Sequence, residues 1–384
     1  MSFVTVAGVE VPATLADEAP QRPRLVLVTR RWGANWGERN AAVRSFVGAA
    51  ALRAEVSVVS LEDPPPAGRV PLRYDGLFPV HSVPVGADLS SGEPSELADA
   101  LQTALGLRPQ VVVLAGGGAL PLGGMLWDAF APSERPRIVA LPLGDIEHSG
   151  AASALGRYLD AIVAFSEAER ALLDELLDPS SPACVRRLRI DLPVNRAAAS
   201  AGLAGMTSFG RFVLVISAFP DDDPGTGTCP PHEYLRQVLG GISIAEACRH
   251  RWLVTGGDRE HRVVWAPNRM NLWRLMARAE VTLDVRPPGP IGREAIESLR
   301  FGTPVVVPAG GAAAEAAAEA GGGLWYRDTG EMVDAVRRLI EDAAMREAMG
   351  TAGRAWSERW HGDGGAFVGE VLELALGEAL PPQP

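Results

Sequence analysis

The sequence contains no lysine, so its 36 basic residues are all arginine. We interpret this absence as the base-composition bias of a GC-rich genome and expect a bacterial protein. The chain also lacks any run of basic residues, and its 47 acidic residues give a net charge of −11. Binding to nucleic acid depends on clustered positive charge. We therefore expect no nucleic-acid partner.

Cysteine and long apolar runs are also scarce. The three cysteines, Cys184, Cys229 and Cys248, lack the spacing of metal ligands, so we expect reduced thiols and no bound metal. The first residues have no basic start followed by an apolar core, which argues against a signal peptide. No apolar run reaches the length of a membrane span. Together these absences predict a cytoplasmic protein.

What the sequence does contain is a regular alternation of strand and helix patterns. Buried parallel strands are near-continuous apolar runs, and residues 24–30 (RLVLVTR) are typical of one. Repetition of this pattern predicts parallel βαβ units and an α/β fold. A chain of 384 residues suffices for two such domains. We expect a lead-in over residues 1–22, a first domain over 23–198, a linker over 195–206, a second domain over 207–356 and a mainly helical tail to residue 380.

Local composition predicts several further segments. The Pro/Gly-rich residues 64–92 are expected to form a loop region. Helices are expected around residues 155–159 and 244–250. Ser166 is typical of the residue that caps a helix start, here the helix over residues 167–176.

The strongest functional signal lies in residues 281–315. An apolar strand runs into a Pro/Gly-rich loop, and a short helix with Glu294 and Glu297 then stops at Gly302. A second apolar strand, residues 304–308, leads to a Gly-Gly loop. A strand, a glycine loop and a helix N-terminus together make an anion site, because free N–H groups and the helix dipole point at the ligand. This arrangement indicates a nucleotide-sugar ligand.

The same stretch carries a family resemblance. The string ESLRFGTPVV from Glu297, followed by Gly310, Gly311 and Glu315, resembles the donor-site signature of the family-4 retaining glycosyltransferases. Residues 165–167 and 252–258 resemble two further elements of that family. The resemblance implies the GT-B fold, in which two Rossmann-like domains face each other across a cleft. It also implies that the C-terminal helix, within residues 357–380, packs back on the first domain.

The resemblance assigns the donor residues. In that family two glutamates eight positions apart flank the donor, and the second, here Glu297, holds the ribose hydroxyls. The position of the first glutamate is occupied by Gly289. Glu294 does not replace it without a change of the loop, because Glu294 lies one helical turn from Glu297. The alternative is that Glu297 is an exposed helix residue paired with Arg293 or Arg300.

The diphosphate is expected to meet the loop before the helix. Gly289 and Gly292 allow close approach of the backbone, and the N–H groups of Arg293 and Glu294 point outward from the helix start. Arg286 and Arg293 add charge-assisted hydrogen bonds. Gly310 and Gly311 are expected to hold a second loop near the sugar or phosphate. The alternative for both loops is a tight turn without a ligand, with solvated arginines.

The acceptor is expected in the first domain. Gly33 and Gly37 occupy the family's glycine-loop position, and Trp32 and Trp36 are candidate platforms for a sugar ring. Asp145 and His148 follow a strand end and are candidates for polar contacts to the transferred sugar. The tryptophans would otherwise pack between the domains, and His148 would otherwise be a surface residue.

By resemblance, the expected activity is transfer of a sugar from a nucleotide-diphosphate donor to a hydroxyl acceptor with retention, without a cofactor. The acceptor is a glycan, a lipid-linked sugar or a small molecule. Gly289 and an acidic loop at residues 217–224, where the family has an arginine and a lysine, support a different interpretation. On that interpretation the chain is a non-catalytic partner or chaperone subunit of GT-B fold. A sugar-nucleotide epimerase is a third interpretation. Contact with a membrane surface or a protein partner is left open, and the basic residues considered for it are Arg30, Arg31, Arg39 and Arg44.

Overall fold

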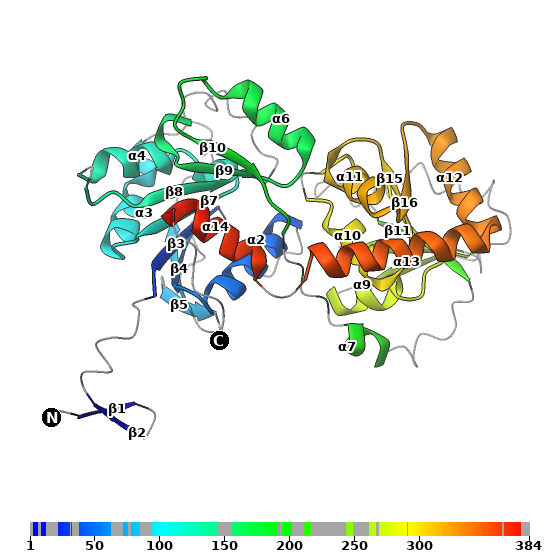
Figure 1. Ribbon diagram of the computed structural model, residues 1–384, viewed down its shortest axis with the longest axis horizontal. Coiled ribbons are helices and arrows are strands. Elements are labelled where there is room, and N and C mark those ends of the chain that lie inside the picture. Colours follow the sequence, from blue (N-terminus) through cyan, green and yellow to red (C-terminus); the bar gives the residue numbers. More distant parts are fainter. Residues whose placement is uncertain are drawn as a thin grey trace.

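Two α/β domains lie next to each other in the computed structural model (Figure 1). The first, drawn in blue to green, is built on an eight-stranded sheet, and the second, drawn in yellow to orange, on a six-stranded sheet. The structure describes residues 3–6, 9–12, 22–30, 32, 38–62, 72–75, 78–84, 94–131, 133–143, 156–190, 192, 194, 196–201, 211–216, 243–248, 261–265, 269–289, 291–362 and 365–377.

The first sheet has the strand order β10-β9-β8-β7-β3-β4-β6-β5. Neighbouring strands are parallel except β5, which pairs with β6 in the antiparallel sense. Side chains of a strand point to alternate faces, and both faces of this sheet are covered, so the central strand β7 (VVVLA) is apolar and buried throughout. The strands are β3 (Arg24–Thr29), β4 (Glu55–Glu62), β5 (Leu72–Asp75), β6 (Phe78–Pro84), β7 (Val111–Ala115), β8 (Arg137–Leu141), β9 (Ala161–Ala164) and β10 (Cys184–Arg187).

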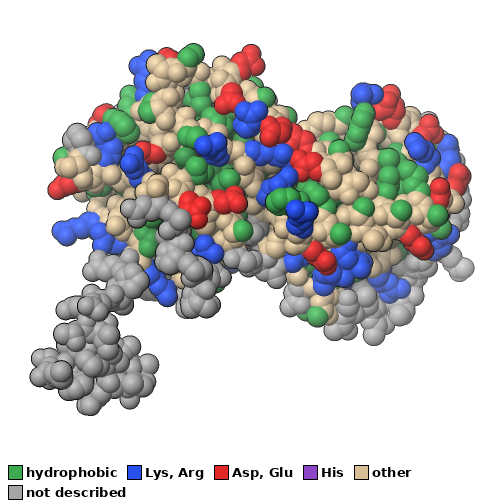
Figure 2. Space-filling view, in the orientation of Figure 1, with side chains coloured by type: hydrophobic (Ala, Val, Ile, Leu, Met, Phe, Trp, Pro, Cys, Tyr) green, Lys and Arg blue, Asp and Glu red, His purple; other side chains and the backbone are tan. Residues whose placement is uncertain are grey.

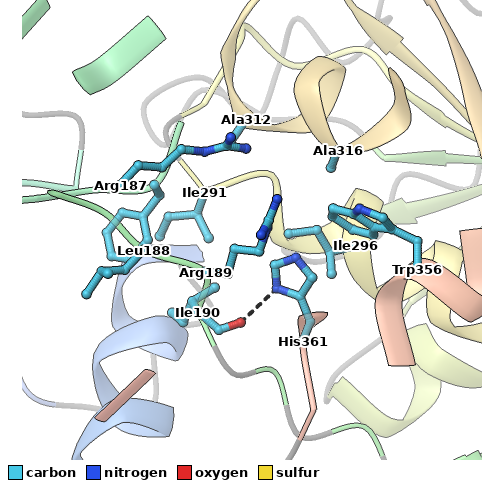
Figure 3. Close-up of a pocket in the computed structure, with 11 residues that line it drawn as sticks. Arg187, Leu188, Arg189, Ile190, Ile291, Ile296, Ala312, Ala316, Trp356 and His361 are labelled. Atoms are coloured by element: carbon cyan, nitrogen blue, oxygen red, sulfur yellow. Dashed lines mark hydrogen bonds between the residues drawn. The ribbon is translucent and has the colours of Figure 1, made fainter. Parts of the chain in front are cut away.

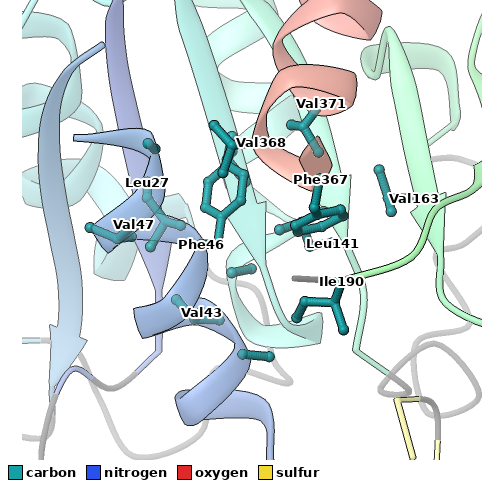
Figure 4. Packing of buried hydrophobic residues seen from close by; sticks show 14 of the residues in the cluster. Leu27, Val43, Phe46, Val47, Leu141, Val163, Ile190, Phe367, Val368 and Val371 are labelled. Carbon is teal, nitrogen blue, oxygen red and sulfur yellow. The ribbon is translucent and has the colours of Figure 1, made fainter. Parts of the chain in front are cut away.

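Helices from both ends of the chain cover one face of this sheet. Leu27 of β3 packs there with Phe46 of α2 (Glu38–Ala50) and Phe367 of α14 (Ala366–Leu376). Figure 4 shows these side chains meeting between the two helices and the strands. On the opposite face Val26 and Val28 pack against the other helices. These are α3 (Pro94–Gly106), α4 (Leu122–Ala129) and α6 (Glu167–Leu176).

The second sheet is parallel, with the strand order β13-β12-β11-β14-β15-β16. Buried residues of α12 cover one face, and buried residues of α9, α10 and α11 cover the other. The strands are β11 (Phe212–Ile216), β12 (Ser243–Cys248), β13 (His261–Trp265), β14 (Val281–Asp284), β15 (Val305–Pro308) and β16 (Gly323–Tyr326). The helices are α9 (Arg269–Met276), α10 (Arg293–Phe301), α11 (Gly311–Ala320), α12 (Thr329–Glu341) and α13 (Ala343–Trp360).

Strand pairing overturns two sequence predictions of local structure, and other segments expected to be irregular contain short elements. Residues 244–250 were expected to be helical, but β12 lies between β11 and β13, so both edges of its backbone are paired. The expected loop over residues 64–92 contains β5 and β6. Inside the expected linker, α7 (Arg196–Ala201) forms, and its Ala199 is buried against residues of α9. Within the expected lead-in, β1 (Phe3–Val6) and β2 (Val9–Pro12) pair as an antiparallel hairpin. Around residues 155–159 the structure has a 3₁₀ turn, Gly156–Tyr158.

Among the described residues, no helix has the length and apolar character that a bilayer crossing requires.

Candidate functional site

Helix α10 begins in the second domain directly after the loop that follows β14. Gly292 precedes it in the left-handed conformation (φ 64°, ψ 31°), and Gly302 ends it in the same conformation, as predicted. A Cβ at Gly292 would lie 2.6 Å from the backbone nitrogen of Ala313. The loop is therefore pressed against the start of α11, and only glycine fits this position. All nine residues of α10 are buried.

The start of α11 meets the same loop from the other side. Ala312 donates its backbone N–H to the Gly289 carbonyl at 3.1 Å, and a Cβ at Gly311 would lie 2.8 Å from that oxygen. Gly310 has φ 87° and ψ 163°, a conformation that essentially only glycine adopts. The nearest atom to a Cβ added there would be Pro288 Cγ, at 4.0 Å. The structure thus brings the predicted glycines together, beside the N-termini of α10 and α11.

A buried cluster of charged side chains surrounds Glu294 in the first turn of α10. The carboxylate of Glu294 accepts hydrogen bonds from Arg269 Nη1 at 2.7 Å and from Arg286 Nη2 at 3.0 Å. Arg286 also binds Asp284, with Nε–Oδ1 at 2.8 Å and Nη2–Oδ2 at 2.5 Å. Burial raises the pKa of Glu294, but the charges of Arg286 and Arg269 outweigh it and hold that pKa well below its usual range. Glu294 is therefore an anion, and Arg286 is tied to two carboxylates.

Glu297 is fully buried, and the two oxygens of its carboxylate differ in their hydrogen bonding. Its Oε1 accepts from Arg293 Nε at 2.7 Å and lies 3.3 Å from Arg269 Nε. Its Oε2 has no hydrogen-bond partner among the described residues. The alternative of an exposed residue is wrong, because Glu297 is 0% exposed, although the pairing with Arg293 is present. Arg300 instead donates to the carbonyls of Leu192 and His361.

Most predicted first-domain residues lie outside the described residues: Gly33, Trp36, Gly37, Asp145 and His148, together with the loop over 217–224 and residues 252–258.

Trp32, in contrast, is described and is 5% exposed. Its backbone N–H donates to Ser60 Oγ at 2.8 Å, and its ring meets that of Phe78 edge-on with centroids 5.6 Å apart. It packs inside the first domain, so it is neither a platform for a sugar nor packed between the domains. The described residues hold no group of three His, Cys, Asp or Glu side chains that could bind a metal ion.

Sequence reasoning missed the ionic contacts between the domains. Glu319 of α11 binds Arg187 at 2.6 Å and Arg189 at 2.8 Å. Burial raises the pKa of Glu319, but the hydrogen bonds from the two arginines outweigh it and lower that pKa. Glu315 accepts from the backbone N–H groups of Glu167 at 2.8 Å and Ala168 at 3.0 Å. Figure 2 shows acidic and arginine side chains gathered side by side where the domains meet.

Two sequence signals accompany these contacts. Glu315 and Glu319 are four residues apart and so share one helix face, and Arg187 and Arg189 are two residues apart in an extended segment.

A pocket lies between the domains next to these ion pairs (Figure 3). His361, 3% exposed, lies beside it and donates from Nδ1 to the Ile190 carbonyl at 2.8 Å. Burial lowers the pKa of His361 to about 4. Its ring packs against that of Trp356, with centroids 4.8 Å apart and the ring planes tilted by 47°. A neutral ring that donates from Nδ1 leaves Nε2 as an acceptor. The pocket is lined by Phe165, Arg187, Leu188, Arg189, Ile190, Ile291, Ile296, Ala312, Ala316, Trp356 and His361.

Comparisons with known proteins agree with this architecture. Residues 253–356, which contain both glycine loops and α10, match the family described as "Glycosyl transferases group 1". No curated protein sequence matches the chain at a significant level.

Solved structures resemble the chain over nearly its whole length. Sucrose-phosphate synthase from Thermosynechococcus elongatus has a TM-score of 0.73 at 16% identity, covering 93% of this chain and 99% of its own. HepE of Anabaena in complex with UDP-glucose has a TM-score of 0.66 at 16% identity, covering 91% and 99%. Trehalose 6-phosphate synthase from Burkholderia multivorans has a TM-score of 0.67 at 14% identity, covering 92% and 98%. At such identities the likeness shows the fold alone, and the fold expected from the sequence is confirmed.

Proposed function

We propose that the protein transfers a sugar from a nucleotide-diphosphate donor to a hydroxyl acceptor with retention. The proposal starts from two findings: the chain has the GT-B fold, and residues 253–356 match the group 1 glycosyltransferases. A uridine nucleotide is the first candidate donor, because HepE of the same fold binds UDP-glucose. No cofactor beyond this co-substrate is needed. The acceptor is a glycan, a lipid-linked sugar or a small molecule.

One observation carries the proposal: the free oxygen of Glu297. Its Oε1 is fixed by Arg293 and Arg269, while its Oε2 is buried and lacks a partner among the described residues. A buried carboxylate oxygen without a partner costs free energy, and a ribose hydroxyl supplies the donor that it lacks. Because two guanidinium groups hold the carboxylate, it is already oriented when the nucleotide arrives.

The two glycine loops supply the second part of the donor site. The N-termini of α10 and α11 carry partial positive charge and N–H groups that have no partner inside their own helix. They lie beside each other because Ala312 N–H binds the Gly289 carbonyl. A diphosphate placed there is stabilised both in the bound donor and as the leaving group. In a front-face reaction the acceptor oxygen bonds to the anomeric carbon on the face from which the diphosphate leaves, without a protein nucleophile.

Gly289 leaves the sugar end of the donor without the family's first glutamate. Asp145 and His148 stay our candidates for polar contacts to the transferred sugar. Gly33, Trp36 and Gly37 stay our candidates for the acceptor side. The role of these five residues in orienting donor and acceptor is part of the proposal.

Calorimetry with UDP, GDP and ADP tests the donor site. We expect one of the three to bind the wild-type protein and Glu297→Ala to weaken that binding by roughly 10-fold or more, the worth of a hydrogen bond to a charged group. Since removal of Glu297 takes a carboxylate away from the buried Arg293, Glu297→Gln serves as a variant of equal size. Glu347→Ala, at an exposed position of α13, is the matched control. Absence of binding to all three diphosphates by folded wild-type protein would contradict the proposal.

The non-catalytic interpretation is favoured by two sequence features, Gly289 at the position of the first glutamate and the acidic residues 217–224. It is distinguished by turnover: on that interpretation the protein binds a diphosphate or a glycan but transfers no sugar from any UDP-, GDP- or ADP-sugar. Sugar transfer that is measured with the wild-type protein and is lost in Glu297→Ala would contradict the non-catalytic interpretation.

A further inference from the structure

We propose that Glu315 is a positioning residue that holds the N-terminus of α11, and through it the donor-side loop, against the first domain. Its importance for sugar transfer rests on the proposed function, whereas its effect on the loop does not.

The carboxylate of Glu315 caps a helix of the other domain. Its Oε2 accepts from the N–H of Glu167 and its Oε1 from the N–H of Ala168. These are the first two N–H groups of α6, which have no partner inside their own helix. The next, that of Glu169, donates to Ser166 Oγ at 3.0 Å, as the sequence predicts. The α6 N-terminus is thus capped jointly by a serine of its own domain and a glutamate of the opposite domain, whose charge also suits the helix dipole.

A second attachment lies one turn further along α11. Glu319 binds Arg187 and Arg189 of the first domain, and Arg187 also lies 3.5 Å from Glu315. Contacts on two successive turns fix both the position of a helix and its rotation about its axis. In the sequence of α11, GAAAEAAAEA, these two glutamates are the only polar side chains. Both polar side chains of the helix therefore serve the contact with the first domain.

The anchored end of α11 supports the donor-side loop. Ala312 N–H binds the Gly289 carbonyl, and Gly292 rests on the backbone of Ala313. Glu315 lies about one helical turn beyond these residues. A shift of α11 therefore moves Gly289 and Gly292 as well. Contact with the first domain and the shape of the proposed donor site are thus properties of one rigid element.

Hydrogen exchange of the full-length protein tests the proposal directly. In Glu315→Ala we expect exchange of the Glu167 and Ala168 amides to rise 10-fold or more. We also expect faster exchange of the Ala312 amide. Glu315→Gln, which keeps one carbonyl acceptor, should lie between Glu315→Ala and the wild type. Glu347→Ala, an exposed glutamate of the same domain, should leave these amides unchanged. Because alanine is the best helix former, Glu315→Ala is expected to keep α11 intact, and circular dichroism checks this.

Kinetics add a second reading. The Glu315 carboxylate is engaged by the backbone of α6 and is not among our proposed nucleotide-binding groups, so we expect the Kd of UDP to change less than 3-fold in Glu315→Ala while kcat for transfer falls at least 10-fold. Unchanged exchange at residues 167, 168 and 312 would overturn the proposal, and so would an unchanged kcat in a variant that has lost the cap. Wild-type protein that binds no diphosphate would contradict the proposed function instead, and the exchange result would still decide the role of Glu315.

Discussion

His361 is a buried base whose ionisation opposes folding. It follows α13, lies against Trp356 and donates from Nδ1 to the Ile190 carbonyl, so it ties the end of the second domain to the segment after β10. Burial lowers its pKa to about 4, whereas the unfolded chain keeps the ordinary value of 6.5. Between these two pH values His361 is protonated in the unfolded chain and neutral in the folded protein.

This difference predicts how stability depends on pH. Because the unfolded state binds more protons, the free energy of unfolding rises with pH from about 4 to about 6.5, by up to about 3 kcal/mol from His361 alone. Urea unfolding at several pH values should show this rise in the wild-type protein. In His361→Gln the rise should be smaller by that amount, while other titrating groups contribute equally to both proteins. Parallel curves for the two proteins would exclude the buried neutral histidine.

At the scale of single residues, the sequence indicated the site well where a backbone constraint is local. Gly292 and Gly302 adopt positive φ at the two ends of α10, and both were expected from their places beside an apolar strand and a helix. The hydrogen-bond partners of Arg286 could not be predicted from the local sequence in this way. Its binding to Asp284 and Glu294 depends on how the loop folds back on the helix.

At the scale of elements, regular patterns predicted helices and buried strands, and pairing between distant segments decided the exceptions. Ser166 caps α6 through the N–H of Glu169, as expected. Strand β7 is buried throughout, as a near-continuous apolar run indicates. In contrast, β12 (SIAEAC) has a helix-compatible composition and becomes a strand because β11 and β13 pair with both its edges. The contact of α11 with α6 is equally invisible in either segment alone.

Packing of α13 on α10 yields an element-scale prediction. A Cβ at Gly350 of α13 would overlap the carbonyl oxygen of Gly302, which ends α10. Gly350→Ala should therefore separate the two helices and lower the free energy of unfolding by about 2 kcal/mol or more. Gly48→Ala in α2 is the matched control, because a Cβ there meets nothing within 4 Å. Urea unfolding should show Gly48→Ala to be stabilising by about 0.5–1 kcal/mol. Equal effects of the two substitutions would contradict close packing at Gly350.

At the scale of the whole molecule, the chain passes between the domains twice. Helix α14 follows the second domain and packs on the first sheet, where the ring of Phe367 meets those of Phe46 at 5.6 Å and Phe165 at 5.7 Å between centroids (Figure 4). The first domain is thus completed by a segment that follows the second domain in the sequence. The exact limits of the domains that the sequence suggested, 23–198 and 207–356, stay a prediction.

Phe367→Ala tests the contribution of α14 to the first domain. Removal of a buried aromatic ring that touches two others should cost about 3–5 kcal/mol of unfolding free energy. Fluorescence of the buried Trp32, followed during urea unfolding of a variant that lacks the other tryptophans, reports on the first domain. Glu373→Ala, at an exposed position of the same helix, should change the free energy by less than about 0.5 kcal/mol. A Phe367→Ala transition at the wild-type urea concentration would show that α14 adds little.

The position of α14 also sets the order in which a newly made chain matures. The first domain leaves the ribosome first, but the apolar face formed by Leu27, Phe46 and Leu141 stays uncovered until residues 366–376 emerge. At a synthesis rate of ~5–20 residues per second, the wait lasts roughly tens of seconds, while the second domain is still being made. The half of the protein that is translated first is therefore the last to close its core, and it depends on chaperones or on rapid translation for that interval.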